Sequence, residues 1–159
     1  MELIKYFVIC VLPLVSLIIC RKYGDFIDLS IERVEAFISF LRHIERRISG
    51  YLTPPSSLGV GFSHPLLSEM LEGLAGGDSL IEAYRAMGAS IPLWADEIIS
   101  ELFLDFGKGD ASLEIRRIRD AVARLEDALS RERENGEKQK KVCSAVAPAL
   151  AIGVVILLI

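Results

Sequence analysis

The sequence predicts an all-α protein, a membrane-anchored helical bundle with a transmembrane helix at each end. Both ends of the chain, 3–20 and 142–159, are nearly continuous apolar runs. At about 1.5 Å of rise per residue, a helix of about 18 residues covers ~27 Å, close to the ~30 Å hydrocarbon core of a bilayer. Between the runs, apolar residues recur at spacings of three and four, and no stretch alternates as a strand would.

We expect three segments: a transmembrane helix at 1–20, a cytoplasmic helical bundle at 21–141 and a transmembrane helix at 142–159. Positive charge gathers on the cytoplasmic flank of spanning helices. Only Lys5 and the terminal amine lie at the far end of the first run. Five basic residues flank the two runs on the side of the middle segment: Arg21, Lys22, Lys138, Lys140 and Lys141. This asymmetry favours a cytoplasmic middle segment.

The composition agrees with apolar ends around one small polar domain. Hydrophobic residues make up 52% of the chain and charged residues 25%, and the net charge is −4. The sequence shows no basic face of the kind that would indicate a nucleic-acid partner. Bulky residues at 18–21 offer no signal-peptide cleavage site. Cys10, Cys20 and Cys143 lie in or at the apolar runs, so we interpret them as small apolar membrane residues rather than a disulfide framework or a zinc site.

The first helix of the bundle is expected at 28–50. Asp28 or Ser30 can cap its start, and Gly50 marks its end before a break at 53–57. Its apolar stripe consists of Ile31, Val34, Phe37, Ile38, Phe40, Leu41, Ile44 and Ile48. The three-and-four spacing of these residues draws one face of a helix, and charged residues fill the other face.

Three short helices are expected next. One runs from about Pro65 to Leu74 and ends at two glycines. Ser79 and Glu82 fit a capping box that opens the second. Pro92 occupies a first-turn position before the third, at 93–104, whose inward residues we expect to be Trp94, Ile98, Ile99, Leu102 and Phe103.

The last helix of the bundle begins near Leu113, with Asp110 as a plausible cap. Its apolar residues are spaced like a heptad seam: Ile115, Ile118, Val122, Leu125 and Leu129. We expect this seam to be core, in a bundle whose two long helices are antiparallel.

The residues indicate no catalytic chemistry and no cofactor. His43 and His64 lack the spacing of a nucleophile relay, so we interpret both as solvated surface. The turn 107–110 lacks the features of a nucleotide loop. Asp105 and Asp110 near Glu114 could hold a cation, but a capped helix start is the favoured interpretation.

A basic stretch on the last helix is the candidate partner-binding site, together with Asp110 and Glu114. Its members are Arg116, Arg117, Arg119 and Arg124, interrupted by Asp120. Two interpretations stay open: a solvated helix face, which is favoured, and a docking surface for an acidic partner.

The layout resembles the stage III sporulation protein AB family of endospore-forming bacteria. A Glu- and Arg-rich helix leads through Ile48 and Tyr51 to Thr53–Pro54. A glycine turn precedes Glu82–Ala83–Tyr84, and Asp110 is followed by Glu114, Ile118 and Leu125–Glu126 before a Lys-rich entry to the closing apolar run. The resemblance spans the full length. Family members usually carry a longer turn before the aspartate, a glutamine where Glu114 stands and a leucine where Pro55 stands.

This resemblance implies a non-catalytic platform subunit of the channel complex that links mother cell and forespore, in the mother-cell membrane around the forespore. The family is similar to the inner-membrane platform F domain of type II secretion. That likeness implies that the cytoplasmic domain docks the complex's secretion-type ATPase, stage III sporulation protein AA, beside other membrane subunits. We expect no small-molecule substrate. The alternative is a membrane-tethered signalling adaptor that pairs with another chain through the Ile115–Leu129 seam.

Overall fold

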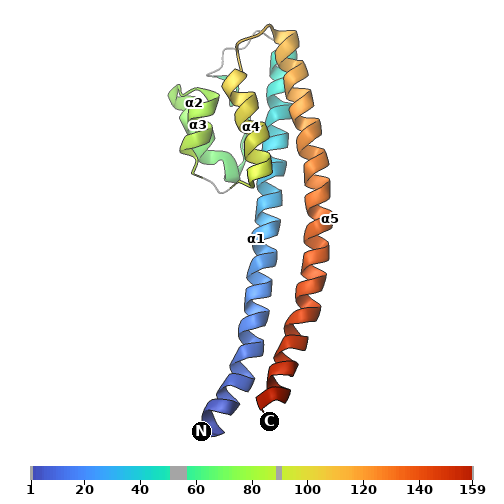
Figure 1. Cartoon of the computed structure of the whole chain (residues 1–159). Coiled ribbons are helices and arrows are strands. Elements are labelled where there is room, and N and C mark those ends of the chain that lie inside the picture. The colour runs from blue at the N-terminus through green and yellow to red at the C-terminus, as the bar shows by residue number, and fades with distance from the viewer. Residues whose placement is uncertain (1, 51–56, 89–90, 159) are drawn as a thin grey trace. The chain divides into compact units, whose positions relative to one another are not determined.

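The structure is a computed structural model that describes residues 2–50, 57–88 and 91–158 (Figure 1). Its elements are α1 (Glu2–Gly50), the 3₁₀ turn η2 (Pro65–Leu67), α2 (Ser68–Gly76), α3 (Leu80–Ala86), α4 (Leu93–Asp105) and α5 (Ala111–Leu158). Every element in these ranges is helical, which confirms the all-α class. Most of the break predicted at 53–57 lies outside the described residues.

The chain divides into two compact units. The first consists of residues 1–29 and 131–159, and the second of residues 30–130. Helices α1 and α5 therefore each contribute one half to the first unit and the other half to the second. We call them the hairpin unit and the head unit, respectively.

Helix α1 does not begin at residue 28, and the predicted cap at Asp28 or Ser30 is wrong. The helix is continuous from Glu2 to Gly50. Residues 21–30 contain no proline and a single glycine, and extending a nucleated helix costs far less than starting a new one. Asp28 instead accepts a hydrogen bond from Lys140 Nζ at 2.6 Å, and Ser30 is buried.

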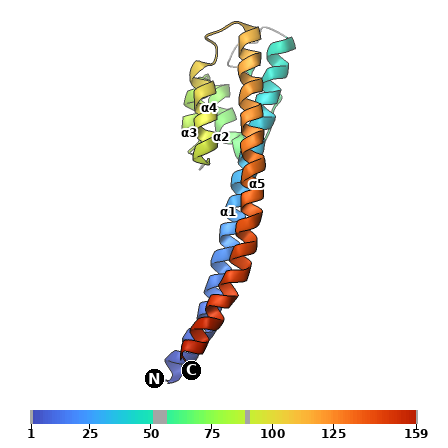
Figure 2. The same cartoon turned by 45° about the vertical axis from the view of Figure 1, so that its right-hand side comes forward.

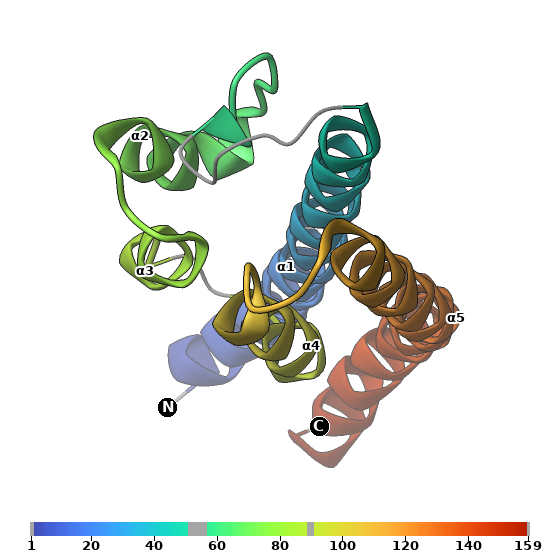
Figure 3. The ribbon, with the colours of Figure 1, turned by 90° about the horizontal axis from the view of Figure 1, so that it is seen from above.

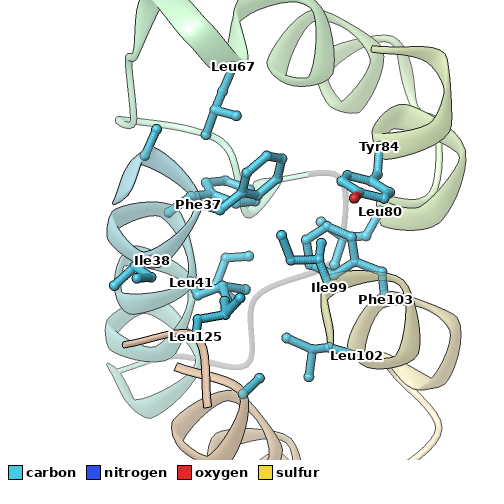
Figure 4. Packing of buried hydrophobic residues seen from close by; sticks show 14 of the residues in the cluster. Phe37, Ile38, Leu41, Leu67, Leu80, Tyr84, Ile99, Leu102, Phe103 and Leu125 are labelled. Carbon is cyan, nitrogen blue, oxygen red and sulfur yellow. The ribbon is translucent and has the colours of Figure 1, made fainter. Parts of the chain in front are cut away.

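The apolar stripe of α1 and the seam of α5 meet in the core of the head unit. Phe37, Phe40, Leu41 and Ile44 are fully buried. On α5, Ile118, Val122, Leu125 and Leu129 are buried as well, which confirms four of the five predicted seam residues as core, whereas Ile115 is only half-buried. Burying each such side chain stabilises the fold by roughly 1.5–3 kcal/mol. Figure 4 shows the cluster, to which η2, α3 and α4 also contribute.

Helices α2 and α3 lie on the side of the head unit away from α5, and α4 lies between them and α5 (Figure 3). Figure 3 shows α5 at one edge of this unit and α2 and α3 at the other. Tyr84 of α3 joins the two sides: its ring packs edge-on against Phe37 of α1 at 5.5 Å and Phe103 of α4 at 5.6 Å between centroids. Trp94, expected inside, is half-buried against the core.

Local capping signals set the short helices. Ser79 and Glu82 form the predicted capping box at the start of α3, and Gly77 ends α2 in the left-handed region at φ 101°. Two details differ from the prediction. The helix expected from Pro65 opens as a 3₁₀ turn before α2, and Pro92 stands at the N-cap of α4 rather than in its first turn.

In the hairpin unit, the outer halves of α1 and α5 run antiparallel, and their ends nearest the two termini lie together (Figures 1 and 2). The described side chains of this unit begin, with few exceptions, at Ile18 and end at Val146. The predicted spans 1–20 and 142–159 therefore lie largely outside them. Within the described residues, no helix carries an apolar stretch long enough to cross a bilayer.

Candidate functional site

The turn from α4 to α5 is built by its own residues. Gly107 takes a positive φ of 83°, and a side chain at Gly109 would come within 2.7 Å of Leu113. Asp110 caps α5 as predicted, since its Oδ1 accepts from the Leu113 amide at 2.8 Å. Glu114 is only 4% exposed, and its Oε1 accepts from the Gly109 amide at 3.1 Å. Glu114 therefore stabilises the turn by a buried hydrogen bond to its backbone.

The acidic residues of this turn act separately rather than as one cation site. Asp105 pairs with Lys108 at 2.7 Å. That ammonium lowers the pKa of the Asp105 carboxyl from its ordinary value by a hydrogen bond and by charge attraction. Asp110 is occupied as a cap. Among the described residues, no three His, Cys, Asp or Glu side chains are grouped so that they could hold a metal ion.

Three of the four arginines predicted to bind a partner contact groups of this chain. Arg119 pairs with Glu45 of α1 at 2.6 Å, and Arg124 with Glu101 of α4 at 3.1 Å. Arg117 donates to the Asp105 carbonyl at 3.1 Å and lies 3.5 Å from Glu114 Oε1. An exposed pair such as Arg124–Glu101 contributes ~0–1 kcal/mol. Much of the basic stretch therefore links α5 to its neighbours.

Arg116 differs from the other three arginines. It is exposed, and no ion pair joins it to a carboxylate in the part of the chain that the structure describes. Leu113, one helical turn earlier, is 38% exposed. Residues three apart on a helix are neighbours on its surface. Leu113 and Arg116 thus form a small apolar and basic edge at the start of α5.

A shallow cavity of about 100 Å³ lies between α4 and α5, and its lining includes Leu102, Arg117, Ala121 and Arg124. Sites for small organic ligands usually measure roughly 300–1,000 Å³. Arg124 already pairs with Glu101 at the rim of this cavity. It is too small and too internally neutralised to serve as a substrate pocket.

Both histidines are only half-buried, and each makes contacts that the sequence did not predict. His43 Nε2 lies 3.2 Å from the Val60 carbonyl, which also accepts from Arg47 at 2.8 Å. His64 caps η2, where its Nδ1 accepts from the Leu66 amide at 3.3 Å. The Phe62 ring stacks with the His64 ring at 6.5 Å between centroids and lies tilted against the His43 ring at 5.5 Å. The segment that follows residue 57 contacts α1, although the two are separated in the sequence. The spacing of neighbouring residues does not reveal such contacts.

Tyr84 and Asp96 make a polar contact in the core. The Tyr84 hydroxyl donates to the Asp96 carboxylate, and the Tyr84 side chain is only 6% exposed. Burial first, and the Asp96 carboxylate second, raise the pKa of this phenol well above its ordinary value of 10.0. A buried phenol bonded to a carboxylate anchors α3 to α4.

The hairpin unit contains the largest departure from the sequence analysis. Cys20 and Cys143 form a disulfide, with Cα atoms 6.0 Å apart, so their interpretation as separate apolar residues is wrong. The antiparallel register brings the two cysteines level across 123 residues of sequence. The same register lets Tyr23 donate to Gln139 Oε1 at 2.9 Å. Reading the two apolar runs as an antiparallel pair in one register would have aligned the cysteines.

Close packing continues along this pair. A side chain at Gly136 would meet Ile27 at 3.1 Å, and one at Gly24 would meet Lys140 at 3.5 Å.

The chain matches no family model, no curated protein and no solved structure.

Proposed function

We propose that this chain is a non-catalytic membrane platform subunit of a secretion-like complex. Its apolar ends insert as a helical hairpin, and its head unit faces the cytoplasm and docks a secretion-type ATPase. On the resemblance to the stage III sporulation protein AB family, we propose that the complex is the mother cell–forespore channel. The ATPase would then be stage III sporulation protein AA, and the membrane the mother-cell membrane around the forespore.

The main support for a membrane hairpin is that α1 and α5 each have a boundary between charged and apolar residues, and that these two boundaries are aligned. On α1, charge begins directly after Cys20, at Arg21, and on α5 it ends directly before Val142, at Lys141. The Cys20–Cys143 disulfide places these two boundaries at the same level of the antiparallel pair. Beyond that level α5 carries no charged residue, and α1 carries only Glu2 and Lys5, at its far end. Two aligned apolar ends on one side of a level fit insertion into a single bilayer.

The exposed side chains beside the disulfide support the same placement. Val15, Ile18 and Ile19 on α1 are 46–62% exposed, and Val142 and Val146 on α5 are 60% and 45% exposed. In water, an apolar surface of this kind is unfavourable. In lipid, the same side chains are the outer face of a spanning hairpin.

The disulfide itself bears on the cytoplasmic placement, because disulfides persist mainly in oxidising compartments. The pair does not lie in the head unit. It lies where charge gives way to apolar residues, so the proposed insertion puts it at the lipid boundary rather than in the bulk cytoplasm. The positive flanks favour a cytoplasmic side for this boundary, whereas a disulfide favours an oxidising compartment. A direct measurement of topology decides between the two.

The head unit supports binding rather than catalysis. Its cavity holds only about 100 Å³, and its conspicuous polar groups act structurally. Glu114 fastens a turn, and Tyr84 joins two helices. Within the predicted partner-binding stretch, Arg116 is the exposed arginine that makes no ion pair with a carboxylate of the described residues, and the exposed Leu113 lies one helical turn before it. We place the centre of the ATPase-docking surface there.

The test is association of the full chain with the ATPase. The chain is reconstituted in lipid nanodiscs, and binding of purified ATPase is measured by interferometry. Arg116→Glu is expected to weaken binding about tenfold or more. The substitution replaces a positive charge at the rim of the interface by a negative charge, which an acidic partner repels. Arg85→Glu on α3 is the matched control and should leave affinity unchanged. Absence of binding by the unaltered chain would contradict the proposal.

The alternative, an adaptor that pairs through the Ile115–Leu129 seam, is not favoured by the packing. Ile118 and Leu125 are fully buried in the chain's own core, and Val122 and Leu129 are less than 10% exposed. A second chain could reach this seam only if the head unit opened.

A further inference from the structure

The hairpin unit carries a cluster of cations at its charge boundary. Arg21 and Lys22 lie on α1 between the level of the disulfide and the level of the Tyr23–Gln139 hydrogen bond. Lys141 lies between the same two levels on α5. The three side chains therefore share one level of the antiparallel pair. We call Arg21, Lys22 and Lys141 the basic collar.

The basic collar is distinguished from the lysines beside it by its exposure and its lack of partners. Lys138 pairs with Glu134 at 2.6 Å, and Lys140 with Asp28 at 2.6 Å, so their charges are neutralised. Arg21, Lys22 and Lys141 are exposed, and no ion pair joins them to a carboxylate in the described part of the chain. The nearest acidic residues on the two helices, Asp25 and Glu137, lie about one turn farther from the apolar ends.

The surroundings of the basic collar select the kind of partner. On its outer side, exposed apolar residues follow at once, with Ile18 and Ile19 on α1 and Val142 and Val146 on α5. A partner must therefore offer negative charge at one level and hydrocarbon directly beyond it. A layer of anionic phospholipids combines the two in this order, with phosphates at its surface and acyl chains directly below them.

We infer that the basic collar binds the phosphates of anionic phospholipids in one leaflet and so gives this chain a preference for them over zwitterionic lipids. This inference rests on the proposed membrane insertion and adds the lipid class that the boundary recognises. Arg21 offers a planar fork for a phosphate, while Lys22 and Lys141 act as point charges. The disulfide beside the collar holds the cations of the two helices at one level.

The test uses the full chain in nanodiscs that contain equal amounts of phosphatidylglycerol and phosphatidylcholine. Lipids retained on the protein are counted by native mass spectrometry after mild release. For three interfacial cations at low salt, a preference of roughly tenfold or more for phosphatidylglycerol is expected, and it should shrink as salt rises. Added inorganic phosphate at millimolar concentration should not reduce it, because free phosphate supplies no hydrocarbon.

Three matched variants make the test specific. Replacing Arg21, Lys22 and Lys141 by Gln should reduce the preference to under about twofold. The charge-conserving set Arg21→Lys, Lys22→Arg and Lys141→Arg should retain it, which separates loss of charge from misfolding. Three Gln substitutions in the head unit, at Arg46, Arg85 and Lys108, remove the same charge and should leave the preference unchanged.

Two results would overturn the inference. Equal retention of both lipids by the unaltered, inserted chain would reject the basic collar while leaving membrane insertion intact. A loss of preference as large in the head-unit set as in the collar set would assign the effect to overall charge. Failure of the chain to enter nanodiscs of either lipid is a different outcome, because it rejects the proposed function together with the inference.

Discussion

Cys20 and Cys143 are joined by a disulfide that fixes the level at which the charged parts of α1 and α5 give way to their apolar ends, and the two Cα atoms lie 6.0 Å apart. This one bond closes a loop that contains the entire head unit. It also lies in the same register in which Tyr23 donates to Gln139 and Ile27 packs against Gly136.

The first prediction concerns this bond. In protein purified without reductant, Cys20→Ser and Cys143→Ser should each abolish the internal cross-link, seen as slower migration on a non-reducing gel. Cys10→Ser is the control and should migrate as the unaltered chain does. Closing a long loop typically stabilises a protein by ~2–4 kcal/mol, so both single variants should unfold at a lower denaturant concentration. Unchanged migration in either variant would contradict the pairing.

The second prediction concerns the seam of α5. Leu125 is fully buried, and truncating such a side chain leaves a cavity. Leu125→Ala should lower the free energy of unfolding by about 2–5 kcal/mol, measured by urea titration of the full chain in detergent with far-UV circular dichroism. Leu104, 49% exposed on α4, provides the control. Leu104→Ala should change stability by less than ~0.5 kcal/mol. Equal losses would mean that Leu125 is not core.

The third prediction concerns Glu114. Its Oε1 accepts a hydrogen bond from the Gly109 amide, but its buried Oε2 has no hydrogen-bond partner among the residues that the structure describes. Glu114→Ala leaves the amide unsatisfied and should cost ~1–3 kcal/mol in the same urea titration. Glu114→Gln keeps an acceptor and removes a buried charge, so it should stay within ~1 kcal/mol of the unaltered chain. Glu97→Ala, at an exposed position of α4, is the control. If Gln and Ala are equally damaging, the charge rather than the hydrogen bond matters.

The fourth prediction is a pH dependence. The pKa of Tyr84 is raised in the folded protein, so its contribution to stability is fully present below the unfolded value of 10.0 and is lost as pH rises above it. Tyr84→Phe cannot ionise. Its stability should therefore fall less steeply above pH 10 than that of the unaltered chain, while at neutral pH it should be lower by ~0.5–1.5 kcal/mol for the missing hydrogen bond. Tyr23→Phe, at an exposed tyrosine, is the matched control. Parallel pH curves for Tyr84→Phe and the unaltered chain would contradict the burial of this phenol.

The features that the sequence predicted correctly depend on residues close together in the chain. The apolar stripe of α1, the Ser79–Glu82 capping box and the Asp110 cap are each encoded within one or two helical turns, and all three are present. Local signals of this kind need no knowledge of the tertiary fold.

The features that were missed depend on register between distant segments. Nothing near Cys20 points to Cys143, and nothing near Glu45 points to Arg119. The basic stretch of α5 looked like one surface because its arginines are adjacent in sequence. Three of the four arginines contact groups on α1 or α4, and the sequence of α5 alone does not reveal these partners.

The central claim, a double membrane insertion with the head unit in the cytoplasm, is tested most directly by protease access. The full chain is produced in a bacterium, and intact spheroplasts are treated with external protease before and after lysis. The account predicts a membrane-bound chain whose head unit is cleaved only after lysis. Cleavage of the head unit in intact spheroplasts, or release of the whole chain by alkaline carbonate, would contradict it.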